Sequence, residues 1–139
     1  MSHPYYDAII AALKDETPSE TGGDTAASLV DDRIHGDQLP ADPRMPSIRV
    51  VAITDLPHQR LSGGKNTNAT VQVDIYAHRN DSATAWQIDR LVRRVLDRAS
   101  LDVSGFVGTQ IACMQRGRPF QEPPFYRITS QYRLWASAG

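Results

Sequence analysis

The sequence predicts an α+β fold: a four-stranded, mostly antiparallel sheet with two helices packed on one face. Residues 70–78 alternate strictly between apolar and polar side chains, as in a strand with one buried face. Over 83–99 the apolar residues recur at helical spacing instead, and charged residues fill most of the opposite side. Three further apolar segments, 47–54, 109–115 and 125–137, have the length and pattern of strands.

Length and composition indicate one ordinary globular domain over residues 1–139. The chain is 40% hydrophobic and 22% charged, which is typical of a globular protein. Its one cysteine, Cys113, excludes an internal disulfide. The N-terminal residues lack the basic and apolar regions of a signal peptide, and no apolar run approaches the roughly 20 residues of a membrane helix. We therefore expect no signal peptide and no membrane partner.

The net charge of −1 hides an uneven distribution. Residues 1–32 carry seven acids and one base, whereas residues 111–139 carry one acid and four bases. Oppositely charged ends favour head-to-tail self-association over uniform binding to nucleic acid. A chance distribution over a solvated surface is the alternative.

The N-terminal third is predicted to contain little regular structure. Tyr6, Ile9 and Leu13 lie on one face of a helix over 4–15, which Pro18 would end. An acidic loop follows over 15–32, and we expect at most one helical turn in it, at 25–30, capped by Asp24. A short strand is predicted at 33–35. The proline-rich stretch over 36–46 is typical of an extended connection.

The central strands are predicted to form a hairpin. Residues 47–54 are almost continuously apolar, which indicates a strand buried on both faces. The connection over 55–68 contains Gly63-Gly64, a composition typical of a turn, and is long enough to be a mobile or functional loop. The strand over 70–78 then runs back antiparallel.

The helix and the second pair of strands follow. We expect the helix to pack through its apolar stripe, which consists of Ile88, Leu91, Val92, Val95 and Leu96. Asp89 and its charged neighbours are predicted to face solvent. After the strand at 109–115, a loop over 116–124 contains one glycine and three prolines. The last strand, over 125–137, is predicted to be central. The flexible loops are thus expected at 15–32, 55–68 and 116–124.

No motif for catalysis, a cofactor or a metal emerges. The segment from Ser62 to Lys65 resembles a phosphate loop only superficially, because the first glycine is missing and a strand follows instead of a helix. The four histidines are scattered without a second ligand at metal-binding spacing. Cys113 lies in an apolar alternation and is interpreted as a buried structural thiol. We therefore predict a protein that is not an enzyme and has no catalytic, cofactor-binding or metal-binding residues.

Three arginines, Arg90, Arg94 and Arg98, form a basic stripe along the helix. A small nucleic-acid-binding module using the arginine face of helix 82–99 would carry such a stripe. Aspartates lie beside it, and no aromatic residues are interleaved to stack on bases. A solvated or subunit-facing helix is favoured, and nucleic-acid binding remains the alternative, with a small-molecule pocket under the hairpin as a third reading.

The order of these segments resembles the tail completion (tail terminator, head–tail joining) proteins of tailed bacteriophages, prophages and gene transfer agents. The resemblance rests on five stretches of the chain and covers nearly its whole length. They are Leu29–Ile34 after the polar loop, Leu39–Val51 with its prolines before the first long strand, Thr70–Ala77, Leu91–Leu96 and Tyr126–Trp135. The longer acidic loop at 15–32 departs from the family pattern.

The resemblance implies a structural virion protein of the tail or neck, assembled in the host cytoplasm. Such a protein caps the tail tube as a ring, usually a hexamer, and docks the head connector or stopper, while DNA passes through the lumen without sequence-specific binding. A ring needs two complementary surfaces on each subunit. The expected contact with the tube or lumen is the hairpin tip, namely Arg60, Leu61, Gly63, Gly64 and Lys65. The expected subunit interface consists of the basic residues Arg90, Arg94, Arg98, Arg116 and Arg118.

Overall fold

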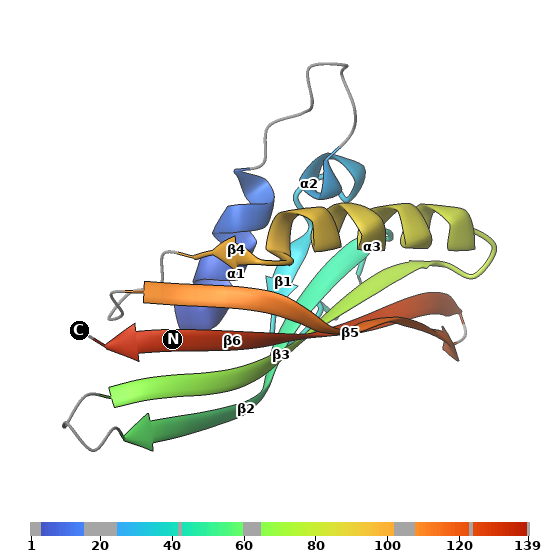
Figure 1. The fold of residues 1–139 in the computed structure, drawn as a ribbon. Helices are drawn as coiled ribbons and strands as arrows, with labels where there is room; N and C mark the ends of the chain where they lie inside the picture. Colours follow the sequence, from blue (N-terminus) through green and yellow to red (C-terminus); the bar gives the residue numbers. More distant parts are fainter. Residues whose placement is uncertain are drawn as a thin grey trace.

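Three helices lie on one face of a six-stranded sheet (Figure 1). The computed structural model describes residues 4–15, 25–41, 43–59, 65–101, 108–122 and 124–138. The helices are α1 (Pro4–Lys14), α2 (Ala26–Leu29) and α3 (Ser82–Leu96). The strands are β1 (Ile34–Gly36), β2 (Ser47–Gln59), β3 (Lys65–His78), β4 (Ala99–Ser100), β5 (Gly108–Glu122) and β6 (Phe125–Ala138). None of these helices is long and apolar enough to cross a membrane.

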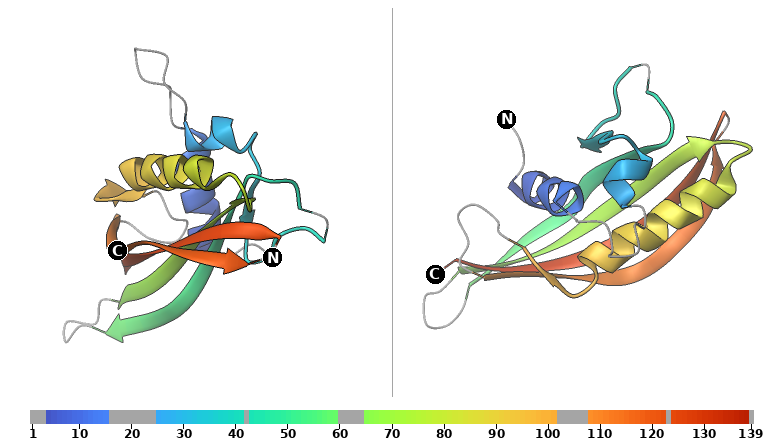
Figure 2. Two further views of the ribbon diagram at one scale, coloured as in Figure 1. Left: turned by 90° about the vertical axis from the view of Figure 1, so that its right-hand side faces the viewer. Right: turned by 90° about the horizontal axis from the view of Figure 1, so that it is seen from above.

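The sheet is mixed, in the order β1-β2-β3-β6-β5-β4. β1 pairs with β2 in parallel, and all other neighbours are antiparallel. β6 lies between β3 and β5, so the prediction that the last strand is central is confirmed. The views in Figure 2 show the long strands twisting beneath α3, which lies along the sheet.

The predicted four-stranded sheet with two helices is wrong. Two short edge strands, β1 and β4, complete a six-stranded sheet, and α2 is a third helix. The predicted loops at 55–68 and 116–124 lie largely within β2, β3 and β5, except for residues 60–64 and 123, which are outside the described residues. The loop at 55–68 was predicted from the glycines at its tip and the loop at 116–124 from its prolines, yet Pro57 and Pro119 both lie within strands. β1 pairs only with residues 48–50, and β4 only with 110–111, so each proline lies on a sheet edge, where proline is tolerated.

The N-terminal elements lie close to their predicted positions. α1 ends at Lys14, and α2 occupies most of the predicted turn at 25–30. The residue that caps α2 is Thr25 rather than Asp24. Its hydroxyl accepts a hydrogen bond from the Ser28 amide, and the Ser28 hydroxyl accepts one from the Thr25 amide, which forms a capping box.

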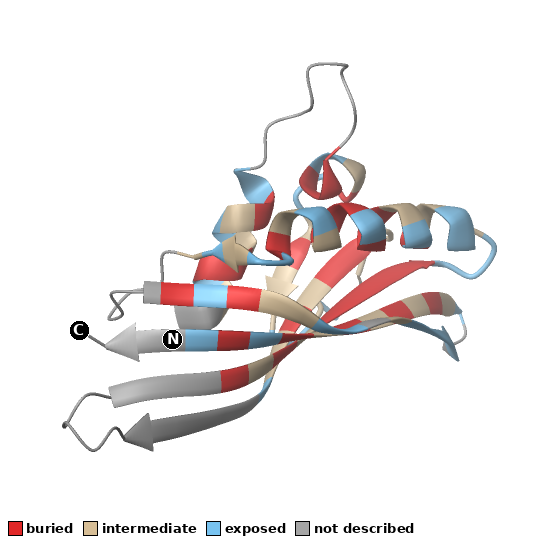
Figure 3. Ribbon diagram, in the orientation of Figure 1, coloured by how far each residue is buried: buried red, intermediate tan, exposed pale blue. Residues whose placement is uncertain are grey.

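The core lies between the helices and the sheet (Figure 3). Of the predicted stripe on α3, Ile88, Leu91, Val92 and Leu96 are buried, and Val95 is half-buried. They pack on the sheet face formed by the alternate residues of β3 and β6, which include Val71, Val73, Ile75, Ile128, Tyr132 and Leu134. The stripe is therefore confirmed, with one addition: Asp89, predicted to face solvent, is buried as well.

Candidate functional site: the helix-free face of the sheet

The face of the sheet opposite the helices has a buried carboxylate at its centre. Asp74 on β3 is 0% exposed although no helix covers it. The Arg49 guanidinium donates to Oδ2 through Nε (3.0 Å) and Nη2, and the Thr129 hydroxyl donates to Oδ1 at 2.7 Å. Gln72 Nε2 also lies within hydrogen-bonding distance of the carboxylate. These donors come from β2, β3 and β6, so the network ties three strands together and neutralises the aspartate.

Arginine and aromatic side chains surround this network. The Arg49 guanidinium lies 5.7 Å from the ring centre of Tyr76, and that of Arg127 lies 4.7 Å from the ring centre of Phe120. The Tyr76 ring also meets Phe125 edge to face at 6.3 Å. Burial, aided by the nearby Asp74 carboxylate, raises the pKa of the Tyr76 phenol above its ordinary value. The phenol is therefore neutral at physiological pH.

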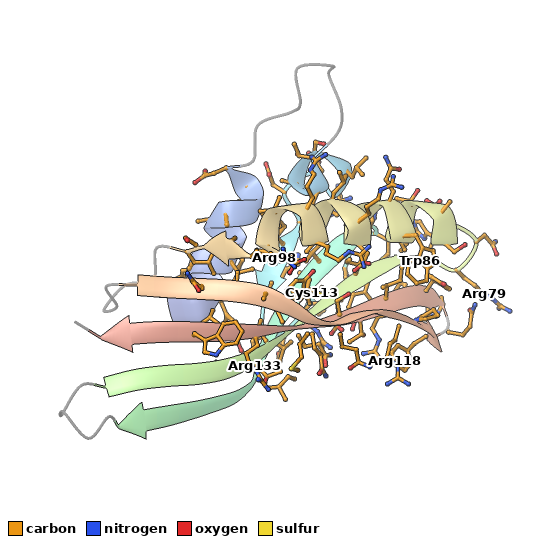
Figure 4. All side chains as sticks on the ribbon, viewed as in Figure 1. Arg79, Trp86, Arg98, Cys113, Arg118 and Arg133 are labelled. Atoms are coloured by element: carbon orange, nitrogen blue, oxygen red, sulfur yellow. The ribbon has the colours of Figure 1, made fainter. Side chains whose placement is uncertain are left out.

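Large apolar side chains and arginines remain exposed on the same face. Phe120 on β5 and Trp135 on β6 are 40% and 44% exposed. Arg118 and Arg133 are exposed as well, and Figure 4 shows both on the side of the sheet away from the helices. Tryptophan and arginine are enriched where protein interfaces gain most of their binding energy. The composition of this face therefore suits contact with another protein.

The five arginines of the predicted subunit interface do not share one surface. Arg90 and Arg94 are exposed on α3, and Arg98 is exposed just beyond the end of that helix, with a left-handed φ of 62°. Arg118 lies on the opposite side of the sheet (Figure 4). Arg116 is part of β5, but its side chain is outside the described residues. The arginines thus belong to two surfaces rather than one.

The predicted contact with the tube falls almost wholly outside the described residues. The connection between β2 and β3, residues 60–64, is outside the described residues, and it contains Arg60, Leu61, Gly63 and Gly64. Lys65 is the first residue of β3, and its side chain is not described either. The connection leaves the sheet at the end where Lys65 pairs with Ala138. The turns after β3 and β5 lie at the opposite end of the sheet (Figure 1).

A second polar cluster lies beneath α3 and was not predicted. The Asp89 carboxylate accepts a hydrogen bond from the Ser130 hydroxyl at 2.7 Å, and its Oδ2 lies 3.8 Å from Arg93 Nη2. The Tyr132 hydroxyl is also buried, with no hydrogen-bond partner among the described residues. A signal existed in the sequence, because Ala85 and Val92 flank Asp89 at helical spacing on the apolar side. This cluster is covered by the helix and offers no surface to a partner.

Among the described residues, no group of three or more His, Cys, Asp or Glu side chains is arranged to hold a metal ion. Cys113 is half-buried, and its backbone amide donates to the Asp97 carboxylate at 2.9 Å. The helix-free face is therefore the strongest candidate for a functional surface in the part of the chain that the structure describes.

Comparisons with known proteins agree with this fold over nearly the whole chain. The family described as "Tail completion protein gp17" matches residues 7–137. A chain in the solved virion of a native gene transfer agent particle is 17% identical, with a TM-score of 0.69 over 95% of this chain and 93% of that one. A second solved structure is 13% identical, with a TM-score of 0.58 over 92% and 93% of the two chains. No curated protein matches the sequence significantly.

Proposed function

This chain belongs to the tail completion protein gp17 family, whose role is structural, and from this premise we propose that it caps the phage tail tube as a closed ring and docks the head connector. A ring of this kind has copies of the chain, the tail tube protein and the connector or stopper as its partners. It contributes architecture rather than catalysis to the virion neck. DNA passes through its lumen without sequence-specific contacts.

The helix-free face of the sheet is the observation that carries the proposal. One face of the sheet is covered by the protein's own helices, and the other exposes Phe120 and Trp135 among arginines. Aromatic residues and arginine are enriched in protein interfaces relative to the rest of the protein surface. A subunit built to work in an assembly accounts for such a face better than a protein that acts alone.

The distribution of arginines supports a closed ring. In a ring, each subunit meets its two neighbours through two different surfaces. Of the predicted interface residues, Arg118 lies on the opposite side of the sheet from Arg90 and Arg94 on α3, and we propose that Arg118 belongs to one of the two ring-forming surfaces. We propose six copies in the ring, in keeping with the size usual for proteins of this role.

The two ends of the sheet suit the two axial partners. We propose that the connection carrying Arg60, Leu61, Gly63, Gly64 and Lys65 meets the tube or the lumen. The connector would then dock at or near the other end, where the turns after β3 and β5 lie (Figure 1).

Complementation of a phage that lacks this chain tests the proposal. Wild-type protein should restore tails of uniform length that join heads. A variant lacking Leu61–Asn66 should fold yet fail to restore them, and an Ala83→Ser variant, changed at an exposed residue of α3, serves as a control for a surface away from the tube. Normal joined tails from the deletion variant would contradict the role of this connection, and normal tails without any copy of the chain would contradict the function.

A further inference from the structure

Among the described residues, the helix-free face carries positive charge that no ion pair of the fold neutralises. The acid at its centre, Asp74, is buried and already bound by Arg49. Arg118 on β5 and Arg133 on β6 are exposed on the same face, and neither takes part in the ion pairs found among the described residues. A partner that covers Phe120 and Trp135 would therefore also gain by presenting acidic groups.

An acidic surface of this kind exists on the same chain. Asp31, Asp32 and Asp37 flank β1, the strand at one edge of the sheet, and all three are exposed. Their φ angles of 52°, 59° and 71° are left-handed, a conformation that aspartate and asparagine tolerate better than most residues. The Arg33 guanidinium lies 3.7 Å from Asp31, whose side chain is nevertheless 91% exposed. We call these three aspartates and the turns that hold them the α2–β1 corner.

Strand addition at the sheet edges is a poor alternative for joining copies. β2 has a bulge between Ala52 and Thr54 and contains Pro57 beyond its pairing with β1. β5 has irregular register between Cys113 and Arg118 and contains Pro119. Bulges, prolines and charges on edge strands discourage pairing with another chain. Contacts between copies are thus expected to use side chains on faces and corners.

We propose that the helix-free face is the surface on which a second copy of this chain docks, through its α2–β1 corner. The inference rests on the proposed ring and names the two surfaces that form its repeating contact. It assigns Arg118 and Arg133 to the interface, opposite Asp32 and Asp37 of the neighbour. The arginines of α3 repel such a basic face and are left for another partner or for solvent.

Neutralising the two surfaces separately and together tests this contact. The variants are Arg118→Gln with Arg133→Gln, Asp32→Asn with Asp37→Asn, and all four changes combined; asparagine preserves the left-handed backbone. Arg90→Gln with Arg98→Gln removes the same charge from exposed positions near α3 and serves as the matched control. Association of the full-length chain is measured by sedimentation velocity over a range of concentrations, and circular dichroism verifies that each variant folds.

Each neutralised pair should weaken association about tenfold, and the four changes together should weaken it little further, because opposing charges couple. The control should associate like the wild type. Fully additive losses, or equal weakening in the control, would overturn the docking surface while leaving the ring intact. A wild type that remains monomeric at every concentration, alone and with tail tubes, would overturn the ring as well.

Discussion

The carboxylate of Asp89 on α3 lies directly against the backbone of Gly117 on β5. A Cβ atom at position 117 would come within 2.9 Å of Asp89 Oδ2 and 2.6 Å of Ile128 Cγ2. Helix and sheet therefore approach closely only because residue 117 has no side chain. The same contact buries Asp89, which the Ser130 hydroxyl and the more distant Arg93 partly compensate.

Gly117→Ala is expected to destabilise the fold by about 1–3 kcal/mol, as overpacking of a close contact does. Urea unfolding measures the loss. Gln115→Ala, at an exposed position on the same strand, is the control and should change stability by less than about 0.5 kcal/mol. Equal stability of Gly117→Ala and wild type would show that α3 does not rest on this glycine.

Leu91→Ala is expected to cost about 2–5 kcal/mol, because truncation leaves a cavity between α3 and the sheet. Leu91 is buried and belongs to the main core. Arg90→Ala, one residue earlier on the exposed side, should have little effect. Thermal or urea unfolding compares the two, and a loss well below 1 kcal/mol for Leu91→Ala would mean that this leucine is outside the core.

Tyr132→Phe is expected to leave the protein equally stable or to stabilise it by up to about 1–3 kcal/mol, because it removes a buried hydroxyl that has no partner among the described residues. Tyr126→Phe is the contrasting variant, since the Tyr126 hydroxyl accepts a hydrogen bond from Trp86 Nε1 at 3.1 Å. Loss of this hydrogen bond should lower the free energy of unfolding by about 0.5–1.5 kcal/mol. A larger loss from Tyr132→Phe than from Tyr126→Phe would contradict the assignment.

The same phenol predicts a loss of stability in alkali. Burial, with a further contribution from Asp89, raises the pKa of Tyr132 well above its ordinary value of 10.0. The unfolded chain loses this proton first, so the stabilisation is complete below pH 10 and declines as pH rises further. Tyr132→Phe should reduce this alkaline decline in urea unfolding. If Tyr132→Phe loses as much stability in alkali as the wild type, other groups cause the loss.

His35 on β1 is expected to make the fold less stable in acid. Burial, followed by the charges of Lys14 and Arg33, lowers the pKa of His35 below its ordinary value of 6.5. The unfolded chain binds this proton more readily, so stability is complete above pH 6.5 and falls as pH decreases through the lowered pKa. In His35→Gln, the free energy of unfolding should change less between about pH 7.5 and 5.5 than it does in the wild type. Wild-type and variant curves of equal slope would contradict this.

The sequence predicted best the elements whose pattern is set by burial. α3, β3 and β6 show clear helical or alternating periodicity, and each lies against the core. The end of β2 was missed because the polar residues before Gly63-Gly64 carry no apolar alternation, and the end of β5 was missed because prolines such as Pro119 normally break strands; only the sheet order shows that Pro119 lies on an edge. β4 has only two residues, too few for a periodic signal.

The candidate surface could be predicted only in part. Alternation along β3 and β6 places Asp74 and Arg133 away from the helices. It does not reveal that Arg49 reaches across from β2 to bury Asp74, because that contact depends on strand order and register. Arg118 could be recognised as basic, but its separation from the arginines of α3 also requires the sheet topology.

We propose that this chain forms a closed ring at the end of the tail tube. Imaging of purified tail tubes saturated with the protein, combined with the mass of the bound assembly, tests it most directly. We expect a fixed number of copies joined as a ring at one end of each tube. Single copies, or protein distributed along the sides of the tubes, would contradict it.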